Sequence, residues 1–209
     1  MELDEKFWEF NNRANIHFNI IHRLGSLLLM YCVTNEKIDD FPNDVNWYNK
    51  DDVRSTNKHR MKETSRMMHG YRKNLNELTI IGLAKTIEDL INDLRDYLNV
   101  DVSFWNDCEG FIFFEEMKII RNLNNCIKHS KGIIKRGHPA NDYLIDIAGF
   151  NENSAVESLS LDIEKYIYNS FSFQMDLFWS TDKRNNPYDV IKNEYKKIRH
   201  QLIPEFIEK

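Results

Sequence analysis

The stretch RNLNNCIKHSKGIIKRG, residues 121–137, gathers an arginine, three asparagines and a histidine ahead of a run of cations. An imidazole titrates near neutral pH and can therefore carry protons, and a guanidinium holds a phosphate through paired hydrogen bonds. Arg121 and His129 are thus suited to acid–base chemistry on a phosphodiester. The sequence has no nucleotide-binding glycine loop, nucleophile elbow or array of metal ligands, so this stretch carries most of the functional information.

A helix must position these side chains. If residues 118–129 are helical, a turn of 100° per residue places Lys118, Asn122, Asn125 and His129 in one polar stripe. This stripe lies opposite the apolar positions and faces solvent or a partner. Arg121 lies one step to its side, and its separation from His129 along the helix axis is about 12 Å.

The motif RNLNNCIKH, followed by SKG, resembles the Arg-polar…His motif of HEPN-domain proteins. The resemblance implies an all-α, HEPN-like helical bundle that forms a homodimer, with two sites meeting across the interface. It also implies an endoribonuclease that uses the substrate's own 2′-hydroxyl, with no metal and no cofactor. Such proteins act in toxin–antitoxin or phage-defence systems, so an antitoxin or a defence protein is the expected partner, and tRNA or mRNA the expected substrate.

The resemblance assigns a role to each polar residue of the motif. His129 is the general base or acid, and Arg121 stabilises the charge that develops on phosphorus. Asn122 and Asn125 position the phosphate or the ribose. The cations that extend the electrostatic footprint for an RNA backbone are Lys128, Lys131, Lys135 and Arg136.

The spacing of the motif departs from the family pattern. Seven residues separate Arg121 from His129, one more than the usual maximum. In the alternative register, Asn124 occupies the position of the family's arginine, and the site is then inactive or uses Arg121 from one turn earlier. We favour Arg121, because the Arg-Asn dipeptide is present there and Asn122 shares the face of His129.

Three other interpretations remain open for this chain. His129 and its neighbouring lysines could form an ordinary exposed helix end, since cations are common near the negative end of the helix dipole. The chain could be a catalytically silent HEPN-like module that dimerises or binds a partner protein, which the Asn124 register favours. It could also be a helical regulator that binds a ligand or another protein through its aromatic C-terminal helices.

Length and composition indicate one domain. The chain has 209 residues, 42% hydrophobic and 29% charged, with only seven glycines and four prolines, which is typical of a packed, mostly helical protein. Its net charge is −5, but the charges are segregated. We expect a single HEPN-like domain over 1–209, with an acidic loop at about 34–52 and a basic segment at about 54–73. The basic segment is most simply a solvated helix face, and an RNA contact is the alternative.

Hydrophobic periodicity and helix-stop signals predict the elements. We expect helices over about 7–32, 53–70, 75–98, 104–130 and 158–179, and a last one from Pro187 to just before Pro204. Gly132 supplies a left-handed stop after the motif helix. Between 132 and 149, glycines separate short β-branched runs, which predicts a small β-hairpin.

The cysteines and the apolar segments indicate the compartment. Cys32, Cys108 and Cys126 are odd in number and far apart, so they support neither a disulfide framework nor a structural zinc site. Cys126 is expected to be a packed small residue. No uncharged apolar run is long enough to span a bilayer, so we expect a cytoplasmic protein without a membrane segment.

Overall fold

The computed structural model describes residues 2–44, 48–98 and 104–180. Its elements in chain order are α1 (Glu2–Asp44), α2 (Arg54–Leu98), α3 (Phe104–Asp107), α4 (Phe114–Ser130), α5 (Pro139–Asp146), the 3-10 turn η1 (Val156–Ser158) and α6 (Ile163–Ser180). The predicted all-α class is confirmed, and no strand forms in these residues.

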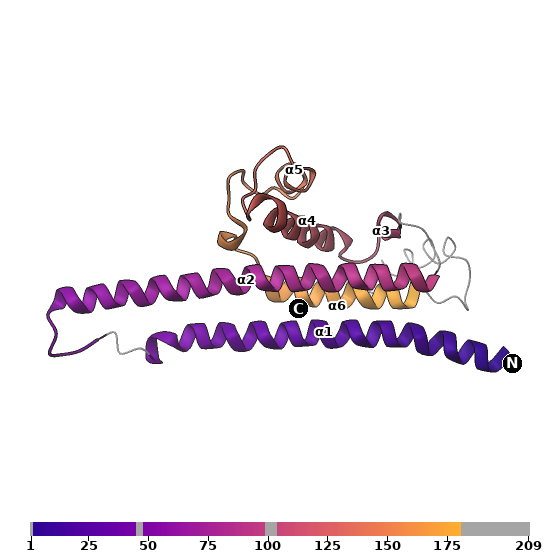
Figure 1. The fold of residues 1–209 in the computed structure, drawn as a ribbon, viewed down its shortest axis with the longest axis horizontal. Helices are drawn as coiled ribbons and strands as arrows, with labels where there is room; N and C mark the ends of the chain where they lie inside the picture. Colours follow the sequence, from indigo (N-terminus) through magenta and orange to yellow (C-terminus); the bar gives the residue numbers. More distant parts are fainter. Residues whose placement is uncertain (1, 45–47, 99–103, 181–209) are drawn as a thin grey trace, which may run out of the picture.

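Two long helices form the scaffold. Helices α1 and α2 run antiparallel, and α6 lies along both of them, as Figure 1 shows. Helix α4 packs against α2 and α6, and α5 packs against α4. The motif helix is therefore held between the long scaffold and a short helix at its outer end.

One continuous hydrophobic core joins these helices, from Ile20 and Leu24 of α1 to Phe173 and Leu177 of α6. Its members recur at helical spacing, which explains why each helix buries a single face. Gly82 of α2 lets the scaffold helices approach closely, since a Cβ atom at this position would lie 2.8 Å from Cδ2 of Leu27.

The acidic loop predicted over 34–52 is wrong in its first part, because α1 remains helical to Asp44. Ile38 is buried in this extension. The ring of Phe41 lies edge-on to that of Tyr71 in α2, with 5.7 Å between centroids. Packing against α2 therefore outweighs the local preference of Asn, Asp and Pro for turns.

Helix α2 runs without a break through Gly70, where the sequence predicted a helix end. Glycine in a helix interior costs about 1 kcal/mol relative to alanine. Thr64 and Leu75, on either side of it, are both buried. Burial on both sides offsets the local cost and joins the two predicted helices, 53–70 and 75–98, into one.

A turn interrupts the helix predicted over 104–130. Gly110 and Phe113 have φ of 95° and 58°, and a right-handed helix does not allow positive φ. The backbone N–H of Ile112 donates to Oδ2 of Asp176 at 2.8 Å, which ties the turn to α6. Helix α4 therefore begins only at Phe114.

The hairpin predicted within 132–149 is wrong. This segment contains α5 and, in the part of the chain that the structure describes, one isolated antiparallel bridge between Ile133 and Ala155. Pro139 is the first residue of α5, a position that suits proline because its φ is already helical and its missing N–H is not needed.

Helix α6 agrees with the predicted helix over 158–179, although it begins at Ile163 after the turn η1. Ile167, Phe173 and Leu177 line its buried face. The last predicted helix, from Pro187, lies outside the described residues.

Among the residues that the structure describes, one helical stretch is long and apolar enough to cross a membrane by length and composition alone. It is the Asn11–Asp44 part of α1, with a mean hydropathy of 1.3 in its most apolar window. A core helix of a soluble protein and a signal sequence near an N-terminus pass the same test. The finding is weak evidence, and the absence of a membrane segment remains a prediction.

Candidate active site

The C-terminal end of α4 sets the position of His129. Lys131 and Gly132 adopt left-handed conformations, with φ of 52° and 70°, and the N–H of Gly132 donates to the carbonyl of Cys126 at 3.1 Å. This pattern is that of a Schellman cap. The predicted stop at Gly132 is confirmed, and His129 lies in the last turn of the helix.

The polar stripe predicted for α4 lies on its outer face. His129 is exposed, and Asn122 and Asn125 are partly exposed. Met117 and Ile120 of the same helix are completely buried. The helical period therefore separated these two faces correctly from the sequence alone.

Arg121 is held away from His129. Its guanidinium carbon lies over the ring of Trp105 in α3, 4.8 Å from the centroid. Such cation–π contacts contribute about 0.5–2 kcal/mol, more where the cation is desolvated. Arg121 thus points toward the N-terminal end of α4, while His129 lies at the C-terminal end, and one chain does not bring the two side chains together.

A second histidine, which sequence reasoning missed, lies beside His129. The rings of His129 and His138 are stacked, with 5.4 Å between centroids and 20° between planes. His138 directly precedes α5. The dipeptide His138-Pro139 was the available signal, because proline at the first helical position marks the preceding residue as the N-cap.

The N-cap role of His138 determines which ring nitrogen is available. Its backbone is extended, as is usual before proline, and its Nδ1 accepts the N–H of Ala140 at 3.3 Å. A nitrogen that accepts a hydrogen bond carries no proton, so the proton of the neutral ring lies on Nε2. His138 therefore presents an N–H donor rather than a base.

The loop between α4 and α5 is tied down by buried and charged groups. Asn141 is buried, and its Nδ2 donates to Oγ of Ser130 at 3.0 Å and to the carbonyl of Lys135 at 2.8 Å. The N–H of Gly137 donates to Oδ1 of Asp142 at 3.1 Å. These bonds join the end of α4 to the start of α5 and fix the two histidines relative to each other.

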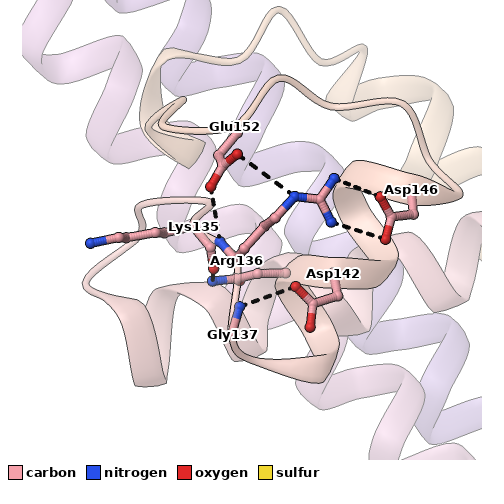
Figure 2. Close-up of polar contacts among 7 residues, drawn as sticks. Lys135, Arg136, Gly137, Asp142, Asp146 and Glu152 are labelled. Carbon is pink, nitrogen blue, oxygen red and sulfur yellow. Dashed lines mark hydrogen bonds and ion pairs between the residues drawn. The ribbon is translucent and has the colours of Figure 1, made fainter.

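Arg136, predicted as an RNA-binding cation, has its charge offset by carboxylates. Its guanidinium binds both oxygens of Asp146, at 2.8 and 3.2 Å, and lies 3.7 Å from Glu152 (Figure 2). The hydrogen bond and charge of Asp146 raise the pKa of Arg136, and the Arg136 hydrogen bond lowers that of Asp146. Arg136 thus fastens the loop rather than presenting a free cation.

The three predicted lysines are arranged differently. Lys128, Lys131 and Lys135 are all exposed, and Lys135 extends away from the carboxylates around Arg136, as Figure 2 shows. They surround the histidine pair in sequence, at the end of α4 and in the loop that follows. The stretch of residues 128–138 therefore supplies two stacked imidazoles and three exposed ammonium groups.

Asn124, the alternative position for the motif's arginine, is only 1% exposed. Neither polar atom of its side chain has a hydrogen-bond partner among the residues described. An unpaired buried amide costs stability. This position faces the core, so an arginine here would have to be buried or bend out of the helix packing.

Cys126 is a packed residue, as predicted. It is completely buried, and burial raises the pKa of its thiol to about 11. A thiol that stays protonated at neutral pH is a poor nucleophile. Within the described ranges, no three His, Cys, Asp or Glu side chains gather as a metal site would require.

The basic segment 54–73 forms the first half of α2, and several of its cations are paired. Arg60 binds Asp52, Arg66 binds Glu63, Arg72 binds Asp39 and Lys73 binds Glu157. The pair of Arg66 and Glu63 lies within α2, and the other three link α2 to α1 and to the connecting segments. Their presence favours the interpretation of this segment as a solvated helix face rather than an RNA surface.

Comparison with protein-family models, with curated proteins and with solved structures finds no match to this chain.

Proposed function

We propose that the surface around His129 binds RNA and that the protein is a metal-independent endoribonuclease of HEPN type, acting in a toxin–antitoxin or phage-defence system. The observation that carries the proposal is an exposed imidazole in the last turn of α4, stacked on a second imidazole and near three exposed lysines in the sequence. Lys128, Lys131 and Lys135 supply positive charge for the phosphates of an RNA strand.

In the proposed reaction the 2′-oxygen of a ribose bonds to the adjacent phosphorus, while the bond from phosphorus to the 5′-oxygen breaks. The 2′-hydroxyl proton passes to a base, and the departing 5′-oxygen takes up a proton. His129 performs one of these transfers and water completes the other. The products are a 2′,3′-cyclic phosphate and a 5′-hydroxyl.

Arg121 is assigned to the negative charge that develops on the phosphate, and Asn122 and Asn125 to positioning the substrate. Because Arg121 and His129 lie about 12 Å apart along one helix and point to different ends of it, a compact site requires two copies of the chain. A homodimer with a two-fold axis would bring Arg121 of one copy to His129 of the other.

The test uses the purified full chain with total RNA and tRNA, in the presence of EDTA. We expect cleavage with cyclic phosphate ends, and its loss in His129→Ala. His22→Ala is a matched control, because His22 is also an exposed helical histidine but lies on α1. Intact RNA with the wild-type protein, with or without added metal ions, would refute the proposal.

The second candidate function is a catalytically silent helical module that dimerises or binds an antitoxin or a defence protein. Two observations favour it: the guanidinium of Arg121 rests on Trp105, and the other arginine register is occupied by buried Asn124. Expression in bacteria distinguishes the candidates. A toxic wild type with a harmless His129→Ala variant excludes the silent module, whereas equal growth of both favours it.

A further inference from the structure

The stacked pair of histidines gives the candidate site two imidazoles where the motif supplies one. His129 comes from the end of α4 and His138 from the N-cap of α5, and their rings lie nearly parallel, 5.4 Å apart. Stacked rings at this separation can reach different oxygens of one phosphate group. The pair is therefore a candidate phosphate clamp, provided that its two members play different roles.

The hydrogen bond that Nδ1 of His138 accepts from the Ala140 amide gives the two rings different roles. It occupies Nδ1 of His138 and leaves Nε2–H as a donor, so His138 does not need a positive charge to bind an anion. His129, which lies in the last turn of α4, is assigned the proton transfer instead.

The surrounding network holds His138 in place before any substrate arrives. Gly137 adopts φ of 103°, which favours glycine, and its N–H bonds to Asp142. Arg136 anchors the preceding loop through Asp146 and Glu152, as Figure 2 shows. A donor that is fixed before the reaction stabilises a developing charge without any cost of reorganisation.

We propose that His138 is a phosphate-binding residue of this site. Its Nε2–H donates to a non-bridging oxygen of the scissile phosphodiester, while His129 transfers the proton. This inference rests on the proposed endoribonuclease function. It means that the chain that supplies His129 also supplies a donor to the charge on the phosphate, a role that the motif alone assigns to Arg121.

The test compares three variants of the full chain in RNA cleavage. His138→Asn removes Nε2–H but keeps an N-cap, because asparagine is among the best N-cap residues and accepts the same amide. We expect kcat to fall about 100-fold or more, as for loss of one oxyanion donor, with an unchanged melting temperature. His138→Ala should lose both activity and α5 stability, and His22→Asn should lose neither.

Nitrogen NMR of the imidazoles tests the same inference without cleavage. In the wild-type chain, His138 should show an unprotonated Nδ1 and a protonated Nε2, and inorganic phosphate should shift the signals of His129 and His138 but not those of His22.

The outcomes separate the two proposals. Full cleavage by His138→Asn, or a proton on Nδ1 of His138, overturns the role of His138 and leaves the ribonuclease proposal standing. A wild-type protein that cleaves no RNA refutes the ribonuclease proposal. If inorganic phosphate also fails to shift the NMR signals of His138, the phosphate-binding role of His138 is refuted as well.

Discussion

Acidification should weaken the packing of α6 on α1, because a buried histidine lies between them. His17 of α1 is 3% exposed, and its Nδ1 lies 2.5 Å from Nε2 of Gln174 in α6. Its ring contacts Phe178 edge-on, with 4.5 Å between centroids. Its Nε2 is buried without a hydrogen-bond partner in the described structure. Protonation would add an N–H at Nδ1, where it would face the amide nitrogen of Gln174, which is itself a donor.

The magnitude follows from proton linkage. Burial, and then the charge of Arg13, lower the pKa of His17 from 6.5 to about 3. Below pH 6.5 the unfolded chain therefore binds a proton at His17 that the folded chain does not bind. The free energy of unfolding has its full value above pH 6.5 and falls as the pH decreases toward 3. Near pH 5 the loss is about 2 kcal/mol, and this figure holds for any folded pKa well below 5.

The assay is urea unfolding of the full chain at pH 7 and pH 5, followed by far-UV circular dichroism. We expect the wild type to lose about 2 kcal/mol of unfolding free energy between the two conditions. His17→Gln removes the titrating group but keeps a polar partner for Gln174, so most of this loss should disappear. Asp93 opposes the effect, since burial raises its pKa.

The comparison of variants decides the outcome. An equal loss of stability in the wild type and in His17→Gln would refute the linkage. His22→Gln, at an exposed position of the same helix, should behave like the wild type.

Three further predictions follow from local geometry. Gly70→Ala should raise the free energy of unfolding by about 1 kcal/mol, because Gly70 lies inside α2 and a Cβ atom there meets nothing within 4 Å, whereas Gly137→Ala, at φ of 103°, should lower it. Thermal unfolding measures both. Asn124→Leu should be neutral or stabilising by up to about 2 kcal/mol, since it removes an unpaired buried amide, and Asn124→Arg should destabilise the fold without strengthening cleavage. Increased cleavage in Asn124→Arg would restore the alternative register. In RNA binding, Lys131→Ala and Lys135→Ala should each reduce the slope of affinity against salt by about 0.7, and Arg136→Ala should reduce it less, because its charge is already offset.

The sequence predicts the helices and helix faces that follow from the helical spacing of apolar residues. It does not predict the helix boundaries that depend on tertiary contacts. The rotation of 100° per residue in an α-helix is enough to predict the outer stripe of α4, which contains Asn122, Asn125 and His129. The extension of α1 to Asp44 depends on the contact of Phe41 with Tyr71 in another helix, which no local propensity contains. Continuation through Gly70 likewise depends on burial against a neighbouring helix.

The second histidine was missed for a different reason. The β-branched run and the glycines of 132–137 outweigh the proline signal at Pro139, so the sequence predicts a hairpin for this segment. A hairpin would place His138 within a strand. As the N-cap of α5 it instead lies over the end of α4, which is a consequence of how the Asn141 and Arg136 contacts fold the loop back.

The position of Arg121 makes the stoichiometry of the candidate site testable. If Arg121 and His129 act within one chain, a substrate strand must touch both ends of α4, and a mixture of Arg121→Ala and His129→Ala proteins stays inactive. If the site is shared across a two-fold axis, each mixed dimer has one intact site, made of Arg121 from one copy and His129 from the other. Random exchange makes about half of the dimers mixed, and in each mixed dimer one of the two sites is intact. The mixture should therefore recover about one quarter of wild-type activity. Light scattering confirms that each variant is a dimer, and co-purification of the untagged variant with a tagged one confirms that the two exchange. Recovery near one quarter establishes the shared site, and no recovery in exchanged dimers refutes it and leaves the phosphate contact within one chain to His138.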